Sequence, residues 1–219
     1  MSWMLSLNNG LLDVTNRTLT QPTPKWFNSS KLRFNYSAQA TCPEWVGWIT
    51  DTLENDPQRI NLVQEFFGYV LTPEAGAQKM MWFLGEGGTG KSTCGQILTQ
   101  LIGHENVSTV SLESWERNFA MAPMLGKMLN IADEVGFINQ KVQLALKWYL
   151  GGTPMTIDRK YMQPIQLKPS ARLLCISNQW PRFADRTEGI WRRVMVCPLE
   201  RMLDPKTMRP EFWRDICTP

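Results

Sequence analysis

The sequence predicts an α/β fold in which a parallel sheet carries a phosphate-binding loop, and three neighbouring observations support this prediction. Residues 85–92 are Gly-Glu-Gly-Gly-Thr-Gly-Lys-Ser, which fits the pattern G-x-x-x-x-G-K-[ST] at every fixed position. The apolar run 80–84 before this motif is typical of a strand that is buried on both faces. After the motif, apolar residues recur at helical spacing up to Gly103, a residue type that often follows the end of a helix.

Between a strand and a helix, the glycines of this motif allow backbone N–H groups to surround an anion, which the helix dipole also favours. Lys91 is predicted to reach the β- and γ-phosphates of a nucleotide, and the Ser92 hydroxyl to ligate Mg²⁺. The alternative is a glycine-rich turn with a chance lysine, but the strand-then-helix context argues against it. The candidate nucleotide-binding residues are Gly85, Glu86, Gly87, Gly88, Thr89, Gly90, Lys91, Ser92 and Thr93.

Composition sets the outer limits of the prediction. A chain of 219 residues that is 43% hydrophobic can bury one substantial core and is expected to hold at most two domains. The five cysteines are scattered without C-x-x-C spacing and there is one histidine, which argues against a zinc site or a disulfide framework. There is no apolar run near the ~20 residues of a membrane span and no signal-peptide pattern, so we expect no membrane partner and a cytoplasmic location.

The net charge of +3 is too small to identify a partner, but its distribution is uneven. Residues 1–150 hold 11 Lys and Arg against 13 Asp and Glu, which leaves 12 against 7 for residues 151–219. The basic surplus therefore follows the nucleotide motif, which indicates an anionic polymer near the later part of the chain.

The segment before the motif is predicted to hold two helices. Residues 1–40 show no sustained periodicity and are interpreted as a connector. Thr41 and Glu44 fit a capping box, which predicts a first helix over about 42–54. Asp56 followed by proline predicts the start of a second helix, whose apolar stripe is interpreted as core.

After the motif, residues 107–110 are a weak strand candidate and 115–119 a short helical piece. The apolar run 128–132 then ends in Asp133 and Glu134, which has the form of a Walker B strand. In such a site the first carboxylate, here Asp133, holds the Mg²⁺ shell, and the second, Glu134, orients and deprotonates the attacking water. A pair of carboxylates at a strand end is common by itself, and it gains significance here from the phosphate loop upstream.

The later chain is predicted to form a helix over 138–150, a hairpin and two further buried strands. The hairpin alternates apolar and polar residues on both sides of a charged turn at 158–161. Such a turn can pair cations with phosphates and stack Tyr161 on a base, although on this segment alone a solvated surface turn is the more common explanation. The buried strands are 172–178, which ends in Asn178, and 194–197, which follows Arg192 and Arg193.

Five segments in this order resemble the helicase domain of phage and plasmid primase-helicases. These are superfamily 3 helicases of the AAA+ class, related to the papillomavirus and polyomavirus replicative helicases. The resemblance covers about residues 60–200, and the order of its segments makes it specific, because a phosphate loop alone does not distinguish superfamilies. The segments are GEGGTGKST (85–93), LNIADE (129–134), YLGGTPMTIDRKYMQPIQLKP (149–169), LLCISN (173–178) and WRRVMV (191–196).

The resemblance implies an AAA+ core that assembles as a hexameric ring, with ATP and Mg²⁺ bound between subunits and single-stranded or forked DNA in the channel. By position it implies Lys91 and Ser92 as phosphate and Mg²⁺ residues, Asp133 and Glu134 as the Walker B pair, and Asn178 as a sensor of the γ-phosphate. It implies Arg193 as an arginine finger that enters a neighbour's site, and leaves the role of Arg192 open between a second sensor and an ion pair. The implied DNA-binding residues are Arg159, Lys160 and Tyr161 at the hairpin tip.

The expected organisation is a connector at 1–40, a small helical region at 41–72, a helicase core at 73–200 and a tail at 201–219. Relatives usually carry an upstream primase or origin-binding domain, so the expectation is an isolated helicase domain or a minimal protein of a mobile element, in a bacterial host or a virus-infected cell. A primase or origin-binding protein is a possible partner. The predicted function is ATP-driven DNA unwinding during replication; the alternatives are a non-catalytic module that joins a full-length helicase and an ATPase that remodels RNA or protein.

Overall fold

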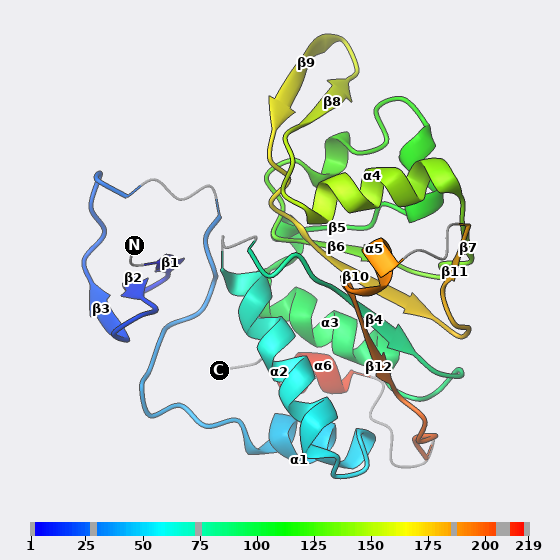
Figure 1. The fold of residues 1–219 in the computed structure, drawn as a ribbon. Helices are drawn as coiled ribbons and strands as arrows, with labels where there is room; N and C mark the ends of the chain where they lie inside the picture. The colour runs from blue at the N-terminus through cyan, green and yellow to red at the C-terminus, as the bar shows by residue number, and fades with distance from the viewer. Residues whose placement is uncertain (1–2, 27–29, 73–75, 185–187, 205–210, 217–219) are drawn as a thin grey trace.

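The computed structural model describes residues 3–26, 30–72, 76–184, 188–204 and 211–216, and a five-stranded parallel sheet forms its centre (Figure 1). The strand order across the sheet is β12-β4-β10-β6-β5, and every neighbouring pair is parallel. The predicted α/β class with a parallel sheet is therefore confirmed. The strands are β4 (Met80–Leu84), β5 (Val107–Ser108), β6 (Leu129–Ala132), β10 (Arg172–Ser177) and β12 (Val194–Pro198).

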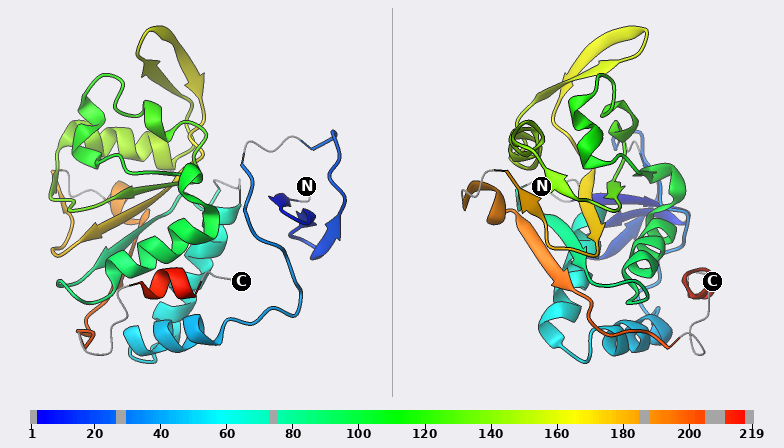
Figure 2. Two further views of the ribbon diagram at one scale, coloured as in Figure 1. Left: turned by 180° about the vertical axis from the view of Figure 1, so that it is seen from behind. Right: turned by 90° about the vertical axis from the view of Figure 1, so that its right-hand side faces the viewer.

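Helices cover both faces of this sheet. Successive side chains of a strand point to opposite sides, and in β4 the side chains on both sides are apolar and buried. Met81 and Phe83 pack on the face that carries α1 (Pro43–Thr52), α2 (Pro57–Leu71), α3 (Lys91–Ile102) and α6 (Phe212–Asp215). Met80 and Trp82 pack on the other face, beneath α4 (Gln140–Leu150), α5 (Glu188–Trp191) and the 3-10 turn η2 (Leu112–Glu116). The three layers can be followed in the rotated views of Figure 2.

The two helices before the phosphate loop form as predicted, but the first one starts differently. The Asp56 side chain accepts hydrogen bonds from the backbone N–H groups of Gln58 and Arg59, so it caps α2 as expected. In contrast, α1 begins at Pro43 after Cys42, which makes no side-chain capping bond. The predicted capping box was wrong, because proline occupies the first helical position and leaves Thr41 outside the helix.

The N-terminal segment contains regular structure that the sequence analysis did not predict. Three short antiparallel strands form a sheet, β1 (Met4–Leu7), β2 (Gly10–Asp13) and β3 (Thr18–Thr20). Strands of three or four residues are too short to produce a clear alternation of apolar and polar residues. Leu7 and Leu12 join the same core cluster as α2 and α3. The predicted domain boundaries remain predictions.

The segments between β5 and β12 include the predicted hairpin, which projects from the body of the molecule (Figure 1). It consists of β8 (Met155–Arg159) and β9 (Met162–Leu167), with Lys160 and Tyr161 at the turn.

The other short elements differ slightly from the prediction. The helical piece expected at 115–119 is η2, which ends at residue 116, and α4 starts at Gln140 because a short strand precedes it. That short strand is β7 (Phe137–Ile138), which pairs in parallel with β11 (Arg182–Phe183). Two further 3-10 turns are η1 (His104–Asn106) and η3 (Ala122–Met124). Among the helices described, none has the length and apolar character needed to cross a membrane.

Candidate nucleotide-binding site

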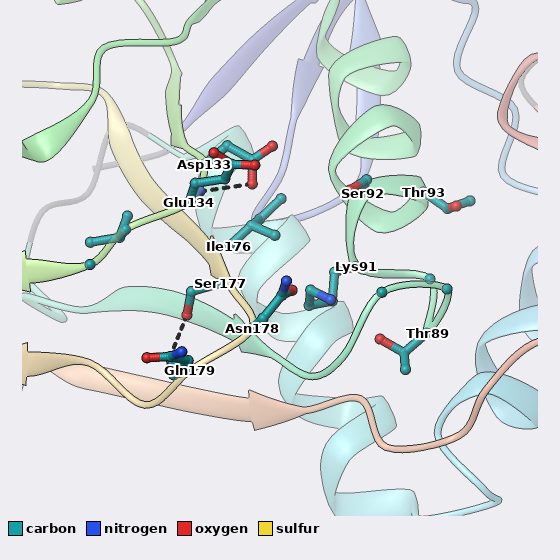
Figure 3. Close-up of a pocket in the computed structure, with 15 residues that line it drawn as sticks. Thr89, Lys91, Ser92, Thr93, Asp133, Glu134, Ile176, Ser177, Asn178 and Gln179 are labelled. Atoms are coloured by element: carbon teal, nitrogen blue, oxygen red, sulfur yellow. Dashed lines mark hydrogen bonds between the residues drawn. The ribbon is translucent and has the colours of Figure 1, made fainter.

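Three of the predicted motifs meet at one edge of the sheet. The phosphate loop follows β4, Asp133 and Glu134 follow β6, and Asn178 follows β10. Because β10 lies between β4 and β6 and all three run parallel, their carboxyl ends open onto the same side. Segments that are about 90 residues apart in the sequence therefore face one another, as Figure 3 shows.

These motifs line a cavity of about 600 Å³. It includes Lys91, Asp133, Glu134 and Asn178, so the structure brings together every predicted catalytic residue except Arg193 and most of the predicted nucleotide-binding residues. Of the predicted loop residues, Gly85 and Glu86 do not line it. The lining residues are Gly87, Gly88, Thr89, Gly90, Lys91, Ser92, Thr93, Asp133, Glu134, Val135, Gly136, Ile176, Ser177, Asn178 and Gln179.

The phosphate loop turns directly into the N-terminus of α3. Gly90 has φ +91°, a left-handed conformation that favours glycine, and Lys91 is the first residue of the helix. The loop is held by its own side chains, because Lys91 Nζ and Thr89 Oγ1 both donate hydrogen bonds to the Glu86 carbonyl, at 2.6 and 2.9 Å. The helix N-terminus and its free N–H groups thus open into the cavity, an arrangement suited to phosphate.

The charges in the cavity are matched to a nucleotide with a divalent cation. Burial lowers the pKa of Lys91, while the negative charge of Asp133 acts in the opposite direction and favours the protonated amine. The Asp133 carboxylate accepts a hydrogen bond from the Glu134 backbone N–H at 3.0 Å, and Glu134 has φ +53°. The Ser92 hydroxyl and the Asp133 carboxylate line the same cavity and are hard oxygen donors of the kind that Mg²⁺ prefers, so the residues present fit this ion.

A segment after the last strand supports the phosphate loop from outside, which the sequence analysis did not foresee. The backbone N–H of Leu199 donates to the Leu84 carbonyl at 2.7 Å, and that of Leu203 donates to the Gly88 carbonyl at 3.0 Å. Arg201 forms an ion pair with Asp51 at the end of α1. The segment 199–203, which we call the brace, therefore contacts both sides of the loop and the helical region, although most of it belongs to the predicted tail.

The site also includes residues that the sequence analysis did not single out. Ser177, Gln179 and Gly136 line the cavity beside the predicted residues. Ser177 and Gln179 directly flank Asn178 in the sequence, so the polar residues around that strand end were the available signal, whereas Gly136 lies two residues after Glu134 and carries no polar side chain.

Arg193 is not near this cavity in the same chain. It directly precedes β12, and its carbonyl accepts from Met80 N at the start of β4, so a whole strand of five residues, roughly 16 Å long, separates it from the phosphate loop. Its guanidinium donates to the Gly189 carbonyl and, at 3.4 Å, to Gln78 Oε1. Within the described residues its buried Nε has no hydrogen-bond partner. The side chain of Arg192, in contrast, is exposed.

The predicted DNA-binding residues lie at the hairpin tip, away from the cavity. Tyr161 is 93% exposed, with φ +60°, and Lys160 Nζ lies 5.0 Å from the centre of its ring. Arg159 has a different position, because its guanidinium donates two hydrogen bonds to the Gln163 carbonyl, at 3.0 and 2.7 Å. Lys160 and Tyr161 are thus presented to solvent, while Arg159 holds the turn together.

The chain combines a parallel α/β sheet, a phosphate-loop motif and a carboxylate pair at the open edge of the sheet, and it is related to the superfamily 3 helicases. The chain belongs to the family described as "Family of unknown function (DUF5906)", whose model matches residues 83–193, just over half of the sequence. A second family model, "D5 N terminal like", matches residues 2–54.

The chain is also similar to individual proteins, in sequence to one viral protein and in fold to solved structures. The chain is 20% identical over 236 aligned residues to "Putative helicase 121R" of Invertebrate iridescent virus 3, which covers 95% of this chain and 24% of that protein. Among solved structures, an apo form of the NrS-1 C-terminal region matches with TM-score 0.66 and 20% identity, over 90% of this chain and 46% of that one. Its A form matches with TM-score 0.63 and 19% identity, over 91% and 46%. The chain thus spans about a quarter of the viral relative and less than half of the solved ones.

Proposed function

We propose that this chain binds ATP with Mg²⁺ at the cavity described above, hydrolyses it, and uses the energy to move along and unwind DNA as a superfamily 3 helicase. The observation that carries the proposal is the convergence of the phosphate loop, Asp133 with Glu134, and Asn178 on one cavity of about 600 Å³. The relationship to helicases supports the same conclusion.

The roles of the residues follow from their positions. Lys91 and the N-terminus of α3 bind the phosphates, which places the γ-phosphate toward Glu134 and Asn178. Glu134 orients the attacking water and accepts its proton, and Asn178 contacts the γ-phosphate as a sensor. Ser92 and Asp133 hold Mg²⁺, which when bound neutralises phosphate charge. Most of the acceleration comes from positioning and charge stabilisation.

DNA binding and assembly belong to the same proposal. The exposed Lys160 and Tyr161 at the hairpin tip bind single-stranded or forked DNA by charge and stacking. The chains assemble into a ring, hexameric as in the helicases that the sequence resembles, in which Arg193 completes the site of a neighbour. A separate primase or origin-binding protein is a further partner of this ring.

The first test is ATP hydrolysis by the wild type, Lys91→Ala and Glu134→Gln, with and without single-stranded DNA. Lys91→Ala should abolish hydrolysis because the phosphates lose their cation. Glu134→Gln should still bind ATP but turn over ~10²–10⁴-fold more slowly, which is the range for loss of a general base. Single-stranded DNA should stimulate the wild type.

Equal hydrolysis by the wild type and Glu134→Gln would remove the catalytic assignment. Binding of ATP without hydrolysis in the wild type would favour the non-catalytic module. Stimulation by RNA or by a protein, and not by DNA, would favour a remodelling ATPase.

A further inference from the structure

A buried serine connects the two strands that carry the phosphate loop and the sensor. Ser177 is the last residue of β10 and is 5% exposed. Its hydroxyl accepts a hydrogen bond from the Trp82 indole N–H at 2.7 Å and donates one to the Gln179 carbonyl, also at 2.7 Å (Figure 3 shows the second bond). Asn178 lies between Ser177 and Gln179, which this second bond joins, so the backbone of Asn178 is held on both sides.

Trp82 is itself held rigidly. It is completely buried in the middle of β4, three residues before the phosphate loop. Its ring packs edge-on against Phe183 at 6.2 Å between centroids, and Phe183 packs in the same way against Trp191 at 5.1 Å. Because an indole has one N–H to donate, the direction of this bond determines where the Ser177 hydroxyl can sit.

The backbone adds a second connection at the same place. The N–H of Gly85, the first residue of the phosphate loop, donates to the Ser177 carbonyl at 3.3 Å. Ser177 therefore contacts the strand before the phosphate loop, the loop itself and the turn that follows Asn178. Such a residue can set the distance between the group that binds phosphate and the group that senses it.

We propose that Ser177 and Trp82 are positioning residues that hold Asn178 in the orientation needed for hydrolysis, an inference that rests on the proposed ATPase function. This buried position needs a side chain that accepts a hydrogen bond from an indole N–H and donates one to a carbonyl, and a hydroxyl can do both. Alanine supplies neither bond and leaves the Trp82 N–H and the Gln179 carbonyl without this partner. Threonine keeps the hydroxyl.

The experiment compares the 219-residue wild type with Ser177→Ala, Ser177→Thr and Trp82→Phe. For Ser177→Ala we expect kcat to fall by up to ~10²-fold, the cost of misplacing a catalytic group by about 1 Å. Its affinity for Mg·ADP should stay within about twofold of the wild type, because the phosphate loop is intact. Ser177→Thr should restore most of the lost kcat, and Trp82→Phe should lower kcat in the same direction but less.

Two controls separate positioning from a general loss of packing. Trp115 is a buried tryptophan of the same core cluster whose Nε1, within the described residues, makes no hydrogen bond, so Trp115→Phe removes an indole without removing such a bond. It should lower thermal stability as Trp82→Phe does while leaving kcat near the wild-type value. In an Asn178→Ala background, Ser177→Ala should change kcat by less than about twofold, because it acts through the side chain already removed.

The outcomes that overturn the inference differ from those that overturn the proposed function. A normal kcat in Ser177→Ala, an equal fall in Trp115→Phe, or full additivity with Asn178→Ala would each reject the positioning role. If Ser177→Ala does not fold, the comparison of kcat between Trp82→Phe and Trp115→Phe decides, and an equal kcat in these two variants would reject the positioning role.

If the wild type hydrolyses no ATP, the proposed function fails, and the inference is then judged by binding alone. In that case Ser177→Ala should reduce the preference of the protein for a non-hydrolysable ATP analogue over ADP. An unchanged preference, or no preference in the wild type, would reject it.

Discussion

At the scale of single residues, Gly85 has a role that its place in the motif does not explain. A Cβ added at this position would lie 2.0 Å from the Leu199 carbonyl oxygen and 3.0 Å from Thr89 Oγ1. Because the first contact is with backbone, a side chain here must displace the brace or the loop. Gly85 is therefore required by the close approach of a segment more than 100 residues later in the chain.

We predict that Gly85→Ala lowers both thermal stability and ATP affinity. The expected loss of stability is about 1–3 kcal/mol, the range for forcing extra atoms into a packed place. Thermal denaturation and equilibrium nucleotide binding measure the two effects.

Gly68→Ala is the matched control for this variant. A Cβ at Gly68 meets nothing within 4 Å, and the residue lies exposed in α2, so alanine should stabilise the protein by about 0.5–1 kcal/mol. An unchanged or raised melting temperature in Gly85→Ala would show that the brace does not press on the loop.

At the scale of elements, the predicted DNA-binding residues of the hairpin of β8 and β9 fall into two groups. Lys160 and Tyr161 are exposed at the tip, whereas Arg159 is bonded to the Gln163 carbonyl within the hairpin. The two kinds should respond differently to mutation, because only the exposed side chains are free to meet a ligand without breaking the turn.

We predict that Lys160→Ala weakens single-stranded DNA binding and reduces its salt dependence, because one phosphate contact is lost. Tyr161→Ala should cost about 1–3 kcal/mol of binding if the ring stacks on a base. Binding titrations over a range of salt concentrations measure both effects. Gln166→Ala, at an exposed position of β9, is the control on the same hairpin and should change neither quantity.

Arg159→Ala should lower affinity without removing the remaining salt dependence, because it loosens the turn that presents the other two residues. Should Lys160→Ala and Tyr161→Ala both bind and unwind DNA like the wild type, the hairpin would be a solvated surface turn.

At the scale of the whole molecule, the cavity lies far from Arg193, the residue predicted as the arginine finger. Arg193 lies at the amino edge of the sheet and the phosphate loop at the opposite edge, so within its own chain this arginine does not reach the cavity. Its contacts with Gly189 and Gln78 also give it a structural role, and burial together with the neighbouring charge of Arg192 lowers its pKa. Arg192 is the neighbouring arginine and is exposed, so Arg192→Ala serves as the comparison for Arg193→Ala.

We predict that Arg193→Ala binds ATP but is almost inactive, since an arginine finger contributes ~10³–10⁵ in turnover in other phosphoryl-transfer systems. Mixing it with Lys91→Ala, which cannot hold ATP but keeps its arginine, should restore activity that neither variant has alone. ATPase assays at rising protein concentration, with subunit exchange verified, measure the recovery.

The same mixing experiment with Arg192→Ala decides which arginine acts in trans. Recovery with Arg192→Ala and not with Arg193→Ala would assign the finger to Arg192 and leave Arg193 as a structural residue. Normal ATP hydrolysis by both Arg192→Ala and Arg193→Ala would show that neither arginine acts in trans, so neither would support assembly into a ring.

The sequence alone was sufficient for the elements whose signals are local. The phosphate loop, the buried strands on either side of it, the capped start of α2 and the hairpin depend on residues within a few positions of one another, so their patterns are visible in the chain. The candidate site could also be predicted, because parallel strands bring their carboxyl ends, and hence Lys91, Asp133 and Asn178, to one edge. The small N-terminal sheet could not, because its strands are too short for periodicity.

Only the tertiary structure decided which distant groups support the site. The bond between Trp82 and Ser177 joins residues 95 positions apart, and the brace reaches the phosphate loop from beyond the last strand. These contacts depend on the order of strands in the sheet. The sequence around Ser177 or Gly85 gives no sign of whether a residue such as Trp82 or the brace lies next to it in the fold. The sequence therefore determined which groups can do chemistry, and packing determined which residues hold those groups in place, because packing depends on contacts that no local pattern records.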